Sequence, residues 1–65
     1  MKTYRFYCRS TRHGFTEWAI ASDNGVETER IDRDVTLETV REFRERAAKA
    51  LEAKGYTPEP NQYTL

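Results

Sequence analysis

The residues of this chain best suited to chemistry gather in the segment YRFYCRSTRHGF, residues 4–15, which holds the only cysteine and the only histidine. Cys8 and His13 suggest a nucleophile and its base, because a thiol needs a base or a positive neighbour to become a thiolate. No third group that would orient them lies nearby in the sequence, and strand alternation directs Cys8 toward the core. We therefore expect a buried, unreactive thiol and no catalytic residue.

The sequence indicates neither a metal centre nor an acid–base site. A metal site needs three or four converging donors, and one cysteine with one histidine supplies too few. The acidic residues between positions 17 and 34 are spaced like exposed strand and loop positions, with no apolar pocket around them. The three glycines are isolated, so no phosphate-binding loop is present. We expect no enzyme activity, no cofactor and no small-molecule substrate.

The chain is short and its charge is uneven. Its 65 residues form one domain that buries only roughly 60% of its unfolded surface, and such a chain usually needs a staple, unusually good packing or a second copy of itself. Net charge is zero, yet residues 1–16 carry four basic residues and no acidic one, which permits a focused contact with an acidic partner. A single cysteine favours a reducing, cytoplasmic setting. No signal peptide or apolar stretch of about 18 residues is evident, so no membrane partner is expected.

Hydrophobic alternation predicts three antiparallel strands. Residues 2–9 alternate aromatic with basic side chains, and a second strand at residues 15–22 follows the loop STRHG. Asn24-Gly25 is the preferred pair of a type I′ hairpin turn, so a third strand returns over residues 26–31.

Helical spacing predicts one helix after the strands. Thr36 is the expected N-cap, with Val35 packing onto Val40, and Gly55 is the expected C-terminal cap. One apolar stripe follows: Leu37, Val40, Phe43, Ala47, Ala50 and Leu51. The predicted fold is therefore α+β. A β-β-β-α domain over residues 1–55 packs the helix on one face of a three-stranded antiparallel sheet, and an extended proline-containing tail covers residues 56–65.

The two turns also predict the register. With STRHG as the first loop, Arg9 faces Phe15 and Phe6 faces Trp18, and the second turn sets Trp18 opposite Ile31. The predicted helix-side residues are Tyr4, Phe6, Cys8, Trp18, Ile20 and Ile31. The predicted opposite face holds Thr3, Arg5, Tyr7, Arg9, Phe15, Glu17, Ala19, Ala21, Thr28 and Arg30. Glu29 falls on the helix side, so we expect a bulge or an edge position in the third strand.

The face opposite the helix is the predicted binding surface, because it sets exposed aromatic residues among arginines and small residues. Its predicted binding residues are Arg5, Tyr7, Arg9, Arg12, Phe15 and Arg30. Tyr63 and Leu65 in the tail are further candidate contacts, since a proline-bearing extended segment loses little entropy on docking. We expect a small intracellular module that binds another protein as an inhibitor or adaptor, or binds itself as a homodimer.

Nucleic-acid binding through the same face is the alternative. Arginine and aromatic side chains on a sheet stack unpaired bases or enter a groove. Glu17 in the middle of the predicted face and a sequence pI near 6.6 argue against it, because such domains commonly have a pI above about 9. The remaining interpretation is that this face is simply exposed to solvent and has no binding role.

Overall fold

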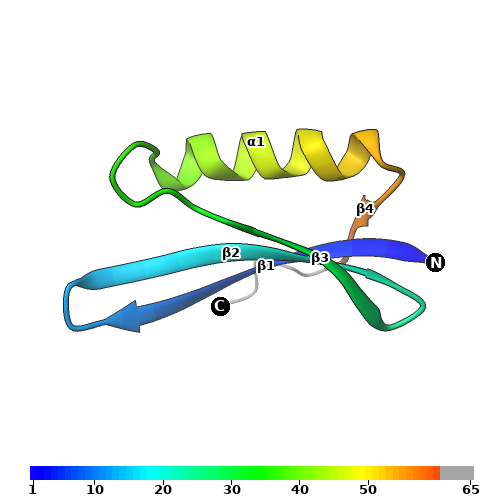
Figure 1. Cartoon of the computed structure of the whole chain (residues 1–65), viewed down its shortest axis with the longest axis horizontal. Helices are drawn as coiled ribbons and strands as arrows, with labels where there is room; N and C mark the ends of the chain where they lie inside the picture. The colour runs from blue at the N-terminus through cyan, green and yellow to red at the C-terminus, as the bar shows by residue number, and fades with distance from the viewer. Residues whose placement is uncertain (61–65) are drawn as a thin grey trace.

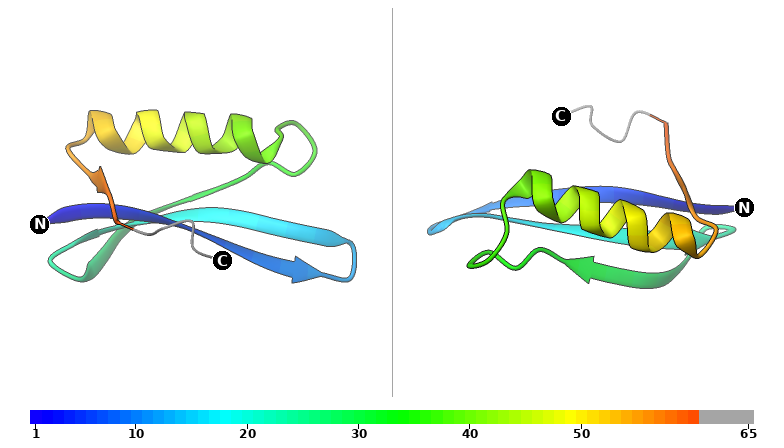
Figure 2. Two further views of the ribbon diagram at one scale, coloured as in Figure 1. Left: turned by 180° about the vertical axis from the view of Figure 1, so that it is seen from behind. Right: turned by 90° about the horizontal axis from the view of Figure 1, so that it is seen from above.

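A computed structural model describes residues 1–60 as one mixed sheet covered on one face by one helix (Figure 1). The elements are β1 (Lys2–Thr11), β2 (Gly14–Asp23), β3 (Val26–Asp32), α1 (Val40–Ala53) and β4 (Thr57–Pro58). Sheet order is β3-β2-β1-β4, and α1 lies above the strands in Figure 1 and in front of them in the right view of Figure 2, which is seen from above.

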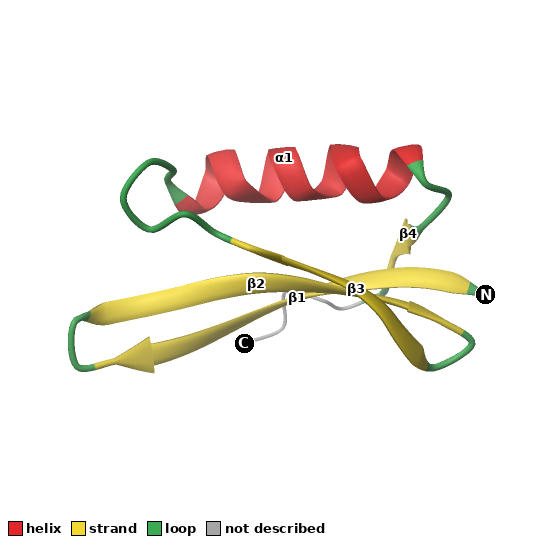
Figure 3. Ribbon diagram, viewed as in Figure 1, coloured by secondary structure: helices red, strands yellow, loops and turns green. Residues whose placement is uncertain are grey.

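The predicted α+β class is confirmed, but the three-stranded antiparallel sheet is wrong. Residues 57–58 were expected to belong to the extended tail. They instead form a strand that pairs in parallel with Thr3 and Tyr4 at the outer edge of β1. The sheet therefore has four strands of mixed direction in the order β-β-β-α-β, as the strands of Figure 3 show. The Glu59 N–H donates to the Tyr4 carbonyl at 3.0 Å and extends this pairing by one hydrogen bond. Tyr63 and Leu65 lie outside the described residues.

The β1–β2 hairpin closes through a two-residue turn, not through the predicted loop STRHG. Thr11 pairs with Gly14, and only Arg12 and His13 lie between them. The Thr11 hydroxyl accepts from the His13 N–H at 3.3 Å and donates to the Gly14 carbonyl at 3.2 Å.

This shorter turn shifts the predicted register by one residue. Phe6 pairs with Ala19, and Tyr7 pairs with Trp18. Because side chains alternate along a strand, a shift of one residue moves every side chain of β2 to the other face. Trp18 and Ile20 were predicted to face the helix, and they lie on the opposite face.

The β2–β3 hairpin confirms the predicted turn and the predicted bulge. Asn24 and Gly25 both have positive φ, 52° and 84°, as a type I′ turn requires. Asp23 pairs with Val26, but the register shifts between Ala21 and Ser22. The extra residue sets Ala19 opposite Ile31, so the predicted pairing of Trp18 with Ile31 is wrong.

The core forms between the aromatic residues of β1 and the apolar face of α1. Phe6 packs edge-on against Tyr4 and Phe43, with ring centroids 5.7 and 5.8 Å apart. Ala19 and Ala21 lie under the helix at 1% and 0% exposure, so β2 contributes small side chains that let α1 approach closely. The buried cluster is Tyr4, Phe6, Ala19, Ala21, Phe43, Ala47, Leu51 and Tyr56.

Thr39, rather than Thr36, caps the helix. The Thr39 hydroxyl accepts from the Glu42 N–H at 3.1 Å, and the Glu42 carboxylate accepts from the Thr39 N–H at 2.9 Å, which completes a capping box. Thr36 instead donates its N–H and its hydroxyl to the Asp34 carboxylate at 3.0 and 2.7 Å, which holds a turn before the helix. Leu37 therefore lies outside the helix and is 80% exposed, against the predicted apolar stripe.

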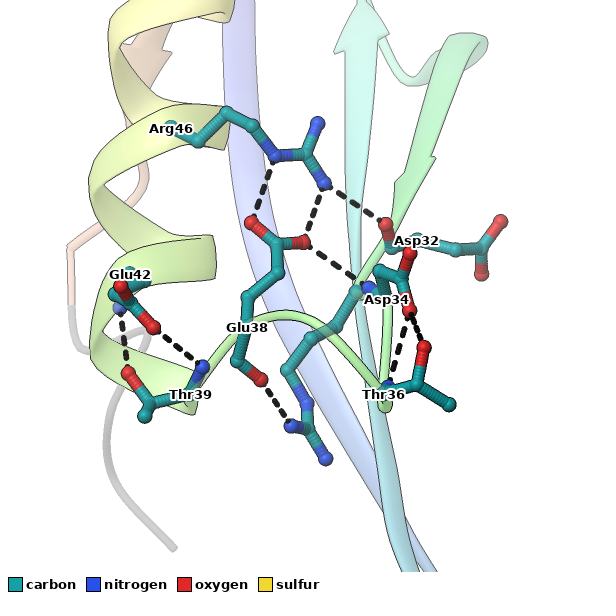
Figure 4. A network of polar contacts seen from close by, with 8 residues as sticks. Asp32, Asp34, Thr36, Glu38, Thr39, Glu42 and Arg46 are labelled. Carbon is teal, nitrogen blue, oxygen red and sulfur yellow. Dashed lines mark hydrogen bonds and ion pairs between the residues drawn. The ribbon is translucent and has the colours of Figure 1, made fainter.

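A polar network anchors the segment between β3 and α1 (Figure 4). The Arg46 guanidinium donates to both oxygens of Glu38 at 2.9 and 2.8 Å, and to the Asp32 carbonyl at 3.1 Å. The Glu38 carboxylate also accepts the Asp34 N–H at 3.0 Å. The hydrogen bonds from Arg46 and from the Asp34 backbone lower the pKa of Glu38 from 4.5 to about 2. The network thus joins the end of β3 to the second turn of α1.

We expect the Glu38 carboxylate to stabilise the fold above pH 4.5 and to lose this contribution as the pH falls toward 2. The pKa in the folded chain is depressed, so protonation favours the unfolded chain in that window. Urea denaturation at a series of pH values should show a weaker acid dependence for Glu38→Gln than for the natural chain. Glu45→Gln, in an exposed pair with Arg41, is the matched control. Equal acid dependence in Glu38→Gln and Glu45→Gln would contradict this role.

Candidate binding surface on the outer sheet face

The outer face is defined here as the side of the sheet opposite α1. The register assigns to it Thr3, Arg5, Tyr7, Arg9, Thr16, Trp18, Ile20, Arg30 and Asp32. Four of the predicted binding residues lie on this face: Arg5, Tyr7, Arg9 and Arg30. Trp18 joins them as a residue that the sequence analysis missed, whereas Ile20 lies on this side but is buried at 9% exposure.

Phe15 and Arg12 do not belong to the outer face. The two-residue turn puts the Phe15 side chain on the helix side, where it is 46% exposed and has the Arg33 guanidinium 5.5 Å from its ring centroid. Arg12 is the first residue of the turn itself, at the end of the hairpin. The predicted surface therefore loses one aromatic residue and gains a larger one, Trp18.

Four side chains form a continuous row across the outer face, which we call the arginine–aromatic row: Arg5, Tyr7, Trp18 and Arg30. The Tyr7 and Trp18 rings stack as cross-strand partners, with centroids 6.0 Å apart and planes 14° apart. Arg5 lies 5.6 Å from the Tyr7 centroid, and Arg30 lies 5.0 Å from the Trp18 centroid. Each cation–π contact contributes about 0.5–1 kcal/mol at an exposed site, so the row is ordered before any partner binds.

The charges of the arginine–aromatic row are compensated locally. Arg30 donates to one oxygen of Asp32 through two nitrogens at 3.1 and 3.0 Å, and Arg5 lies 3.7 Å from the Glu59 carboxylate. Among residues 1–60, Arg9 and Arg12 have no carboxylate partner. Positive charge is therefore uncompensated at the end of the β1–β2 hairpin and not at the row.

Glu17, predicted on the outer face, is buried under the helix at 2% exposure. Its Oε1 accepts from the Nε of Arg44 on α1 at 2.5 Å, while its Oε2 has no hydrogen-bond partner within the described residues. The Glu17 carbonyl also accepts the Arg33 N–H at 3.0 Å, which continues the β2–β3 pairing by one residue. The outer face thereby loses the acidic residue that the sequence placed at its centre.

Cys8 is exposed, contrary to the prediction of a buried thiol. It lies on the helix side of β1, near the N-terminal end of α1, where it lines a pocket of about 310 Å³ with Phe15, Val40 and Arg44. Within residues 1–60, no group of three histidine, cysteine or acidic side chains is placed to hold a metal ion. In the same part of the chain, no helix is long and apolar enough to cross a membrane.

Comparison with protein-family profiles, with curated proteins and with solved structures finds no match to this chain. The argument for function therefore depends on the outer face itself.

We expect Arg44→Met to destabilise the fold by about 2 to 3 kcal/mol, because it leaves the Glu17 carboxylate buried without its cation. This is below the usual cost for a fully buried pair, since the Arg44 side chain is 33% exposed. Adding Glu17→Leu should recover most of the loss. Arg41→Met, which removes an exposed pair with Glu45, is the control and should change the free energy of unfolding by less than about 0.5 kcal/mol. Equal losses in the two arginine variants, measured by urea denaturation, would disprove the role of the pair.

Proposed function

We propose that this chain is a small non-enzymatic module that binds another protein through the arginine–aromatic row of its outer face. The observation that carries the proposal is the orientation of β2. That strand turns Trp18 away from the helix and buries Glu17 and two alanines under the helix. Hydrophobic burial alone favours Trp18 in the core and Glu17 on the surface. Departures from this hydrophobic pattern concentrate at functional sites.

The residue types of the row support a protein partner. Tryptophan, tyrosine and arginine are the residues enriched at the energetic centres of protein interfaces. The stack between Tyr7 and Trp18 and the two guanidinium contacts fix these side chains in advance. A pre-ordered surface loses less side-chain entropy on binding, so more of the contact energy appears as affinity.

The charge and geometry of the row also support a partner of mixed polarity over a nucleic acid. Its two arginines already have carboxylate partners, Asp32 and Glu59, which lowers the attraction for phosphate. Each ring already has a guanidinium over it, so a base would have to displace an arginine to stack there. An inhibitor or adaptor in a reducing compartment such as the cytoplasm fits this surface and the exposed thiol of Cys8.

Nucleic-acid binding remains the second candidate because of the hairpin end. Arg9 and Arg12 lack carboxylate partners within residues 1–60, and Glu17 no longer opposes them. A two-stranded ribbon with basic residues at its end is a known way to enter a groove of DNA.

We expect no interaction of the labelled chain with short single-stranded or duplex DNA at moderate salt. An amide-resolved NMR titration at low and then moderate salt measures this directly. Salt-sensitive shifts at Arg9 and Arg12 that persist at moderate salt would replace the protein-binding proposal by the nucleic-acid one.

We expect the double variant Tyr7→Ala/Trp18→Ala to lose binding to the partner protein, and we expect Phe15→Ala to retain it. Phe15 is the matched control, because it is about as exposed as Tyr7 (46% against 41%) but lies on the helix side. Parallel affinity capture with the natural chain and the two variants, quantified by mass spectrometry, identifies proteins with this pattern. For such a protein the dissociation constant should rise about 30-fold or more in the double variant. A partner that binds both variants equally would show that the row is not the interface.

A further inference from the structure

A pocket lies where the end of the β1–β2 hairpin meets the segment that follows β3. Figures 1 and 2 show that segment at the same end of the molecule as the β1–β2 turn. The pocket has a volume of about 440 Å³, and no acidic residue lines it within residues 1–60. The side chains that line it are those of Thr11, His13, Phe15, Thr16, Arg33 and Val35. None of them belongs to the arginine–aromatic row, so the pocket is a separate site.

The cation in this pocket is Arg33, and no carboxylate within residues 1–60 forms an ion pair with it. Its Nη1 donates to the Glu38 carbonyl at 2.8 Å, and its Nη2 donates to the Phe15 carbonyl at 3.3 Å. The Glu38 carboxylate pairs with Arg46 instead. The Nε of Arg33 is buried and has no hydrogen-bond partner in the same part of the chain. A buried donor without a partner is costly, so Arg33 favours an acceptor that enters this pocket.

The backbone of Phe15 adds a second donor at the same edge of the sheet. The Glu17 carbonyl accepts the Arg33 N–H on the β3 side of β2, and residues two apart in a strand direct their backbone groups to the same side. The N–H of Phe15 therefore also points to that side, as does its carbonyl, which accepts from the Arg33 side chain. β3 pairs no further than Asp32, opposite Trp18. Within residues 1–60, the Phe15 N–H thus has no strand opposite it.

We propose that this pocket binds the C-terminal carboxylate of a peptide whose last side chain is apolar. The guanidinium of Arg33 and the N–H of Phe15 are the donors for the two carboxylate oxygens. The apolar side chain packs on Phe15 and Val35, which are 46% and 56% exposed. The Arg33 guanidinium lies 5.5 Å from the centroid of the Phe15 ring and covers one face of it, so charge and apolar surface adjoin in the pocket. The last residue of a peptide carries these two features on one carbon atom.

The number of charges favours a carboxylate over a phosphate. A phosphate group carries up to about two negative charges and three acceptor oxygens, which suit a cluster of cations. A single guanidinium lines this pocket within residues 1–60, and the apolar residues beside it offer a phosphate nothing. Arg9 and Arg12 lie near the turn and attract an anion at longer range without lining the pocket. The inference goes beyond the proposed function and does not depend on what the arginine–aromatic row binds.

We expect an acetylated tetrapeptide that ends in leucine to bind with a dissociation constant below about 1 mM. The same peptide with a C-terminal amide should bind about tenfold more weakly or worse, because it loses the charge-assisted hydrogen bonds. An amide-resolved NMR titration of the full chain measures both, with shifts expected at Gly14, Phe15 and Val35 and none at Asn24 in the β2–β3 turn. Equal affinity of acid and amide would overturn the proposal. Isocaproate has the leucine side chain and the carboxylate but no amide group, so equal affinity for it would overturn the peptide as the occupant.

We expect Arg33→Met to weaken binding of the tetrapeptide acid about tenfold or more, and Arg12→Met to weaken it less than about threefold. Arg12 is the matched control, because it also lacks a carboxylate partner within residues 1–60 but does not line the pocket. Equal losses in the two variants would reduce the site to general charge attraction and overturn the proposal.

A second variant decides the question even if Arg33→Met alters the fold. Val35→Asp changes an exposed side chain and sets a like charge beside the bound carboxylate, so it should weaken binding about tenfold. Circular dichroism confirms folding of each variant. Unchanged binding in Val35→Asp would contradict the site. The double variant Tyr7→Ala/Trp18→Ala should bind the peptide as the natural chain does, which separates this test from that of the proposed function.

Discussion

The ion pair between Glu17 and Arg44 makes the observed orientation of the central strand possible. A carboxylate with a fully buried side chain is strongly destabilising unless a cation accompanies it, and α1 supplies that cation from near its N-terminal end. Because β2 alternates, fixing Glu17 under the helix also fixes Ala19 and Ala21 there and turns Trp18 and Ile20 outward. The composition of the core and the character of the outer face both follow from this orientation of β2.

The alanines under α1 have a further consequence for packing. With small side chains from β2, the helix approaches the sheet closely enough for Phe43 to contact the edge of the Phe6 ring. The bulk of the core therefore comes from β1 and α1, and Trp18 is not needed there. Its position beside Tyr7 stabilises the outer face through stacking, but it leaves the Trp18 side chain only half-buried in a chain with a small core. That arrangement is most readily explained by a partner that covers the outer face.

Local signals in the sequence predicted local structure well. Asn24-Gly25 predicted the second turn, the misplaced Glu29 predicted the bulge, and the alternation of β1 placed Arg5 and Tyr7 on the correct face. The prediction of the first turn was wrong because hydrophobic alternation favours Trp18 in the core. The opposite orientation is accompanied by an ion pair between Glu17 and Arg44, which are 27 residues apart in the sequence. The pairing of β4 could not be predicted either, because a strand of two residues shows no alternation of hydrophobic and polar side chains. The N-cap was predictable in principle, since Thr39 and Glu42 have the spacing of a capping box.

The same turn that reverses β2 also lengthens the β1–β2 hairpin. A two-residue turn extends the hairpin to Thr11 and Gly14, while β3 stops opposite Trp18 and β4 stops opposite Tyr4. The end of the hairpin is thus a two-stranded ribbon, which is marginal by itself in water. Within residues 1–60, Arg9 and Arg12 thus carry their uncompensated charge on the part of the sheet with the fewest neighbouring strands.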